Sequence, residues 1–122
     1  MKTLLLFLAS AVFAAAAPVT VKDVSYYDAA ALEKADDYQK SQCKLDVRHP
    51  DGGKDLPVIL WFHGGGLTGG KRSFPAYPNE NVVLVGIGYR FDPPGKFPCF
   101  LEDAAAASAW AFKNIANYGG DP

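Results

Sequence analysis

The sequence predicts an α/β fold in which antiparallel edge strands lead into parallel central strands. Two short apolar segments, residues 58–62 and 82–87, have the length and the β-branched content of strands that are covered on both faces. A single long alanine-rich stretch follows, from Pro98 to Asn117, and is predicted to be the one long helix. Buried strands combined with such a helix indicate a layered α/β domain.

The first 16 residues are predicted to be a secretory signal peptide. Lys2 precedes a short apolar run, and small residues follow it at positions 14–17. The apolar run is shorter than the roughly 20 residues needed to cross a bilayer. Cleavage after Ala16 puts Ala14 and Ala16 at the two small-residue positions. The mature chain is therefore expected to be secreted or periplasmic, without a membrane anchor.

Residues 17–43 are predicted to form a polar N-terminal arm on the surface of a domain that begins at residue 44. Residues 44–49 alternate between polar and apolar side chains, which is the pattern of a half-buried strand. The sequence Pro50-Asp51-Gly52-Gly53 then predicts a turn. Strand, turn and following strand are expected to form the antiparallel edge.

The two apolar strands are predicted to be parallel neighbours, and parallel neighbours need a crossover connection. Residues 64–81 supply it, but Pro75, Pro78 and five glycines leave room only for a short or broken helix. The long helix after Pro98 is expected to lie close against the sheet and to stop at Gly119-Gly120. Its predicted core contacts are Phe100, Trp110 and Ile115.

The most informative motif is His63-Gly64-Gly65-Gly66, directly after the first apolar strand. Glycines let the backbone approach a ligand closely, and acyl transfer needs N–H donors aimed at the oxygen that becomes negative in the tetrahedral intermediate. One interpretation is a plain glycine-rich turn. The position after a buried strand, with Tyr89-Arg90 at the end of the next strand, favours an oxyanion loop.

On these residues the chain resembles the α/β-hydrolase superfamily, specifically carboxylesterases and lipases with an HGGG oxyanion loop. Tyr89-Arg90 is similar to the hormone-sensitive-lipase-like branch, whereas Phe91-Asp92-Pro93-Pro94 departs from it; bacterial feruloyl-esterase-like enzymes are also similar. The resemblance covers residues 44–122. It implies that Gly65 and Gly66 form the oxyanion hole, with His63 and Gly64 as support for the loop.

The resemblance implies a secreted serine hydrolase that cleaves small carboxylic esters, and an N-terminal, incomplete part of the hydrolase fold. Its nucleophile elbow, Gly-x-Ser-x-Gly, and the acid and base that follow are expected beyond Pro122. No serine of the sequence has such glycine neighbours, and neither His49 nor His63 is assigned a base role. Two alternatives remain: a non-enzymatic domain that binds a carboxylate or carbohydrate, and an inactive truncated product.

Two further pairs of residues carry structural predictions. Arg90 is expected to form a bidentate ion pair with Asp103 at the start of the long helix, with a solvated Arg90 as the alternative. Cys43 and Cys99 are chemically able to form a disulfide in an oxidising compartment. The other interpretation is that both are small buried residues.

Composition argues against several other classes of protein. A net charge of −1 and a pI near 6.0 provide no attraction for nucleic acid or for anionic lipid. The histidines and cysteines fall at no metal-ligand spacing, and no cofactor is expected. Residues 65–71 match the phosphate-loop pattern G-x-x-x-x-G-K, but Arg72 stands where a serine or threonine is needed to hold Mg²⁺. The oligomeric state is left open.

Overall fold

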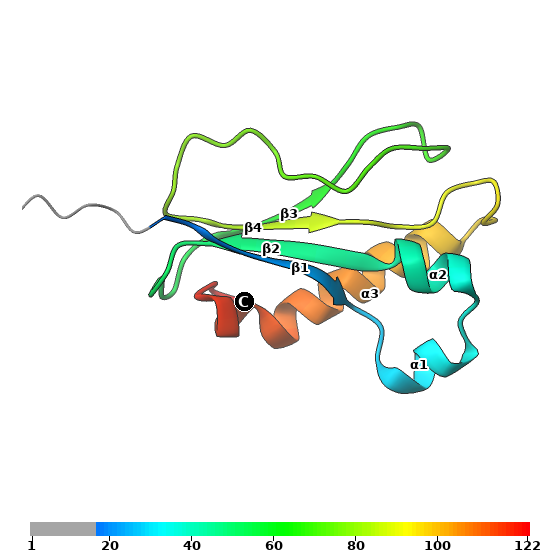
Figure 1. Cartoon of the computed structure of the whole chain (residues 1–122), viewed down its shortest axis with the longest axis horizontal. Helices are drawn as coiled ribbons and strands as arrows, with labels where there is room; N and C mark the ends of the chain where they lie inside the picture. The colour runs from blue at the N-terminus through cyan, green and yellow to red at the C-terminus, as the bar shows by residue number, and fades with distance from the viewer. Residues whose placement is uncertain (1–16) are drawn as a thin grey trace, which may run out of the picture.

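The computed structural model describes residues 17–122, so the predicted signal peptide lies outside the described residues. Four strands form one mixed sheet in the order β1-β2-β4-β3 (Figure 1). They are β1 (Val19–Ser25), β2 (Lys44–His49), β3 (Val58–Phe62) and β4 (Val83–Ile87). The helices are α1 (Ala29–Lys34), α2 (Asp37–Gln42), α3 (Cys99–Asn114) and the 3-10 turn η1 (Ile115–Tyr118). The α/β class predicted from the sequence is confirmed.

Strand β4 lies inside the sheet because it is apolar on both faces, and all its residues are buried. Val83 and Val85 pack into the core together with Ala107 of α3. On the other face, a Cβ at Gly86 would meet the Ser73 carbonyl oxygen at 2.5 Å. Glycine at this position therefore lets the connection between β3 and β4 pack closely on β4. β3 runs parallel to β4, from Val58 beside Val83 to Phe62 beside Ile87, which confirms the predicted parallel pair.

The antiparallel edge exists, but it is not a hairpin of the strands around the turn at 50–53. β2 pairs antiparallel with β1 on one side and with β4 on the other. Because β4 separates β2 from β3, the strand-turn-strand prediction was wrong. Residues 50–57 carry the chain past β4 to the far edge, and this leaves the inner position to the strand that is apolar on both faces.

Residues 17–43 are more regular than a surface arm. β1 adds an edge strand to β2, and the N-terminus of each short helix is capped by an aspartate. The Asp28 and Asp36 carboxylates accept hydrogen bonds from backbone N–H groups at 2.8 and 2.7 Å. Tyr26 and Cys43 are buried in the core. β1 was missed because all of its residues are exposed or half-buried and show no clear apolar alternation.

The long helix has the predicted place and end. Ala107 and Ala111 are buried, and Gly119 has the left-handed φ of 82° that ends the turn after α3. Ile115 and Trp110 pack against the core as predicted. Phe100 does not join that core cluster; it lines a hollow near the end of β3 instead.

The crossover from β3 to β4 contains no helix at any described position. It lies on the side of the sheet opposite α3 (Figure 1). Arg72 attaches it to the edge strands, since its guanidinium pairs with Asp23 of β1 at 2.5 Å and with Asp46 of β2 at 3.0 Å. The expected short or broken helix is thus replaced by an irregular segment that is held by ion pairs.

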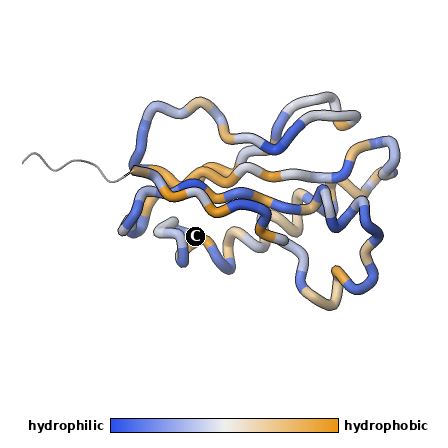
Figure 2. Tube along the Cα trace, in the orientation of Figure 1, coloured by the Kyte–Doolittle hydropathy of each residue, from blue (hydrophilic) through white to orange (hydrophobic). Residues whose placement is uncertain are grey.

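The strand β3 is less covered than its apolar sequence predicts. Apolar residues concentrate along the strands (Figure 2), yet Trp61 and Phe62 are 39% and 37% exposed. β3 is an edge strand in the described sheet, whereas β4 is buried throughout, so full coverage is confirmed for β4 only. Among residues 17–122, every helix is too short or too polar to cross a bilayer.

Candidate oxyanion site

The glycine loop begins at the end of β3 and has a backbone that only glycine adopts easily. Gly65 has a φ of 138° and Gly66 a φ of 62°. A Cβ on Gly65 would overlap the Gly69 carbonyl oxygen. The glycine at position 65 is therefore required by two independent features of the loop, its backbone angle and its closeness to Gly69.

The N–H groups of Gly65 and Gly66 are open. Neither donates a hydrogen bond to another group within the described part of the chain, and both residues are exposed. The Gly65 carbonyl, in contrast, is occupied: it accepts from the Thr68 N–H at 3.2 Å and from the Thr68 hydroxyl at 3.1 Å. A loop with free donors and an occupied acceptor is suited to holding an anion or a polarised carbonyl oxygen.

His63 is buried and is held by its ring and by its backbone. The ring stacks on Tyr89 and lies perpendicular to the Phe91 ring, with centroids 4.6 and 5.7 Å away, respectively. Its Nδ1 lies 2.9 Å from the Gly64 carbonyl, which can only accept, so Nδ1 carries the hydrogen. The Tyr89 hydroxyl donates to the His63 carbonyl at 2.5 Å. These contacts join the loop to the end of β4.

Two residues of this arrangement were not found from the sequence. Gly70 has a φ of 126°, and a Cβ there would collide with the His63 ring and the Gly64 carbonyl. Tyr89 was noted only as half of a family motif, although its ring and its hydroxyl both hold His63. For Gly70, the sequence did offer a signal, the adjacent glycines Gly69-Gly70.

Replacing Tyr89 by phenylalanine is expected to lower the free energy of unfolding by about 1 kcal/mol, because one buried hydrogen bond to the His63 carbonyl is lost while the stacked ring is kept. Urea unfolding of the protein measures this. Tyr77→Phe, at an exposed tyrosine, is the control and should change stability by less than about 0.5 kcal/mol. Equal stability of both variants would contradict the role given to the Tyr89 hydroxyl.

Arg90 and Asp103 lie together. Asp103 is fully buried and accepts from Arg90 Nη2 at 2.7 Å, Arg90 Nε at 3.0 Å and the Arg90 backbone N–H at 2.9 Å. The Tyr27 hydroxyl donates to it at 2.7 Å. Burial alone raises the pKa of Asp103, but the hydrogen bonds from Arg90 and Tyr27 outweigh it and bring the pKa below its ordinary value. The pair fixes the loop after β4 to the start of α3.

Cys43 and Cys99 are both free and buried. Burial raises the pKa of the Cys43 thiol to about 12, so at neutral pH it is protonated and a poor nucleophile. The structure therefore agrees with two small buried residues and provides no disulfide between them.

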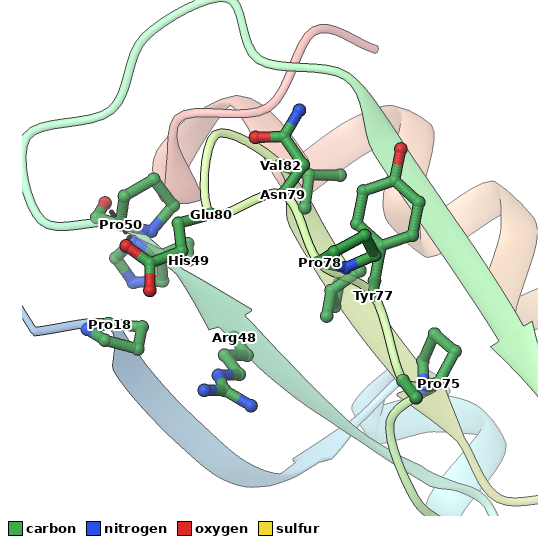
Figure 3. A pocket seen from close by; sticks show the side chains of 12 residues that line it. Pro18, Arg48, His49, Pro50, Pro75, Tyr77, Pro78, Asn79, Glu80 and Val82 are labelled. Carbon is green, nitrogen blue, oxygen red and sulfur yellow. Dashed lines mark hydrogen bonds between the residues drawn. The ribbon is translucent and has the colours of Figure 1, made fainter.

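Two hollows lie in the surface of the described chain. One of about 340 Å³ adjoins the glycine loop and is lined by Phe62, His63, Leu67, Tyr89, Phe100, Leu101 and Ala104. The other, of about 510 Å³, lies near the start of β4, with Arg48, His49 and Glu80 around it (Figure 3). None of the predicted site residues lines this second hollow, which is therefore a separate feature.

The phosphate-loop alternative lacks the helix that it needs. No helix begins directly after Lys71, since the next one, α3, begins at Cys99, and Arg72 is paired with two aspartates. Residues 17–122 contain no group of three or more histidine, cysteine, aspartate or glutamate side chains arranged to hold a metal. The Ser108 hydroxyl donates to the Ala104 carbonyl at 2.9 Å inside α3, as expected of a helical serine.

Sequence and structure comparisons connect this geometry to known proteins. No protein-family model matches the chain. The chain is 40% identical to rabbit (Oryctolagus cuniculus) cocaine esterase over 61% of its length and 46% identical to mouse (Mus musculus) carboxylesterase 1F over 55%. It spans only 16% and 14% of those curated relatives.

The fold also matches a solved structure. The crystal structure of esterase B from Lactobacillus rhamnosis superposes with a TM-score of 0.61 over 85% of this chain and 33% of that one, at 18% identity. At that identity the match supports the fold alone, and the similarity to the mammalian esterases supplies the sequence relationship. The chain is therefore similar in sequence to mammalian carboxylesterases, and its fold matches part of an esterase structure.

Proposed function

We propose that the loop of residues 63–66 is the oxyanion hole of a secreted serine hydrolase that cleaves small carboxylic esters. The observation that carries the proposal is the pair of unpartnered N–H groups at Gly65 and Gly66. Donors of this kind stabilise the oxygen that becomes negative in the tetrahedral intermediate. His63 and Gly64 support the loop and take no part in proton transfer.

The serine nucleophile and its acid and base are proposed to lie in chain beyond residue 122. The direction of the last described residues supports this. The Leu56 N–H donates to the Gly119 carbonyl at 2.9 Å, and the Asp121 N–H donates to the Leu56 carbonyl at 2.8 Å. Gly120 thus pairs in parallel with Leu56, just before β3. The chain at this point is aimed along the free edge of β3.

A strand that continued in this register would place the residue opposite Phe62 six positions after Gly120. Its C-terminal end would then lie beside the glycine loop, because parallel strands end at the same edge of a sheet. A serine on a sharp turn at that end would have its hydroxyl next to the Gly65 and Gly66 N–H groups. Base and acid residues would then activate it for attack on the ester carbonyl.

Hydrolysis of p-nitrophenyl butyrate tests the proposal. The 122-residue chain is compared with the product of the complete reading frame that contains it. We expect activity only in the longer protein, and loss of that activity when its elbow serine is replaced by alanine. Activity in neither protein would favour the non-enzymatic binding domain or the inactive product. Activity in the 122-residue chain alone would contradict the proposed position of the nucleophile.

Secretion is part of the proposal and has its own test. Expression with and without residues 1–16 should give export of the longer form only, with an N-terminus at Ala17 in the exported protein. An exported protein that retains residues 1–16 would contradict cleavage after Ala16.

A further inference from the structure

The chain leaves the glycine loop through residues 69–72, the return arm, which packs directly against the loop. The Gly69 carbonyl oxygen lies so close to Gly65 that a Cβ on Gly65 would overlap it. Gly70 lies against the His63 ring, and a Cβ on Gly70 would collide with that ring. Groups packed this closely cannot move independently of one another. A displacement of the return arm therefore displaces the glycine loop.

The return arm and the chain that follows it have few polar attachments to the rest of the protein. Residues 69–81 lie outside the helices and strands, and within the described part of the chain they make no hydrogen bond between backbone groups. Their side-chain hydrogen bonds are a local one, in which Asn79 accepts from the Asn81 N–H, and the one that Arg72 donates to Asp23. Among residues 17–122, Arg72 thus provides the polar attachment of the return arm to the sheet.

Strands β1 and β2 present two neighbouring carboxylates to Arg72. The pairing of β1 with β2 shifts register between Val21 and Val24, and Asp23 within this bulge has a left-handed φ of 59°. The Asp23 N–H donates to Asp46 Oδ1 at 2.9 Å, so the two aspartates lie side by side. Like charges this close repel each other unless a cation lies between them.

The Arg72 guanidinium is that cation. Its Nη2 donates to Asp23 Oδ1 at 2.5 Å, and its Nε lies 3.0 Å from Asp46 Oδ2 as a charge contact without the alignment of a hydrogen bond. The side chains of Arg72 and Asp46 are 20% and 15% exposed, whereas that of Asp23 is 65% exposed. Water screens a partly buried pair less than an exposed one, so the contact with Asp46 is expected to be the stronger.

We propose that Arg72 is a positioning residue for ester hydrolysis, because its ion pairs hold the return arm and the return arm holds the N–H groups of Gly65 and Gly66 in direction. The inference rests on the proposed function and adds to it a residue that touches no substrate. A misplacement of about 1 Å can lower a rate about 100-fold. Loss of the ion pairs should therefore lower kcat about 10- to 100-fold. KM should change little, because the oxyanion interaction is made mainly in the transition state.

Arg72→Met in the full-length protein tests the inference, and Lys71→Met is its matched control. Lys71 is the preceding residue and is exposed, so the control removes the same charge without breaking the ion pairs. Hydrolysis of p-nitrophenyl butyrate gives kcat and KM, and titration with a phosphonate ester counts the active sites. We expect kcat per active site to fall about 10- to 100-fold in Arg72→Met and to stay within about twofold in Lys71→Met.

Two further variants keep the test decisive if Arg72→Met does not fold. Asp46→Asn keeps the shape of the side chain and an acceptor for the Asp23 N–H, but removes the charge that faces Arg72. It should lower kcat in the same way, and combining it with Arg72→Met should add little, because both changes remove one contact. Arg72→Lys keeps the positive charge and should recover part of the lost kcat.

The possible failures can be told apart. Unchanged kcat per active site in both Arg72→Met and Asp46→Asn overturns the inference, even if fewer active sites are counted, because Arg72 would then serve stability alone. An equal loss in Lys71→Met also overturns it, since positive charge near the loop would then set the rate. A full-length parent protein that hydrolyses no ester overturns the proposed function and this inference with it.

Discussion

Replacing Gly65 by alanine is expected to lower kcat for ester hydrolysis by the full-length protein about 10²- to 10³-fold, the usual effect of losing one oxyanion donor. The added Cβ would overlap the Gly69 carbonyl oxygen, and the φ of 138° is not open to alanine. The loop must therefore move, and the N–H groups of Gly65 and Gly66 lose their common direction. KM should change little, because the interaction is made mainly in the transition state.

Gly52→Ala is the control for this prediction. Gly52 also has a positive φ, 69°, but it lies in the turn after β2, and a Cβ there would meet no other atom within 4 Å. It imposes backbone strain without disturbing the loop, so kcat should stay within about twofold of the parent value. Equal activity of Gly65→Ala and the parent would remove Gly65 from the oxyanion hole.

Asp103→Asn is expected to lower the free energy of unfolding by about 3 kcal/mol, the lower end of the range for removing one partner of a buried ion pair. Asp103 is fully buried, whereas the Arg90 side chain is 15% exposed and keeps some contact with water. The asparagine keeps the shape of the side chain but removes the buried counter-charge of the guanidinium. Chemical denaturation measures the difference.

Glu102→Gln is the matched control for the charge. Glu102 is the preceding residue on α3, its side chain is 61% exposed, and it lies 3.8 Å from Arg90. Because the Glu102 carboxylate is exposed and water screens its charge, the pair contributes between zero and about 1 kcal/mol, and this variant should stay close to the parent. Similar losses of unfolding free energy in both variants would contradict the prediction that the buried carboxylate of Asp103 contributes more to stability than the exposed one of Glu102.

The Asp103 pair also predicts how stability depends on pH. Its folded pKa is lower than the unfolded value, so its contribution is complete above about pH 5 and is lost as the pH falls through the folded pKa. Asp103→Asn should therefore lose less stability than the parent between about pH 5 and pH 2. The same loss of stability at acid pH in both proteins would contradict the lowered pKa of Asp103.

The elements that the sequence predicted well are those with strong local signals. β4 is apolar at every position and lies inside the sheet, and α3 ends at Gly119 as its glycine pair predicts. Arg90 and Asp103 meet because the loop after β4 is followed directly by the first turns of α3. In these cases local composition and the three-dimensional arrangement agree.

Strand pairing was harder to predict because it depends on distant residues. The turn at 50–53 is a sound local signal, yet β2 pairs with β1 and β4. β1 itself has no clear apolar alternation, and its place is fixed by β2 and by the ion pair between Asp23 and Arg72. A local sequence pattern cannot predict contacts between residues this far apart in the chain.

The glycine loop and the supporting position of His63 were predicted from the motif and from the family resemblance. Gly70 and the Tyr89 hydroxyl were not predicted, because only folding brings them to His63. The hollow beside the loop combines the end of β3, the loop and the start of α3, so its existence depends on how α3 packs against the sheet.

The most direct test of the oxyanion-hole assignment is a crystal structure of the full-length protein after reaction with a phosphonate ester, whose phosphonyl oxygen mimics the oxyanion. We expect that oxygen about 2.7–3.1 Å from the backbone nitrogens of both Gly65 and Gly66. A phosphonyl oxygen held by other donors, with these two N–H groups directed elsewhere, would contradict the account.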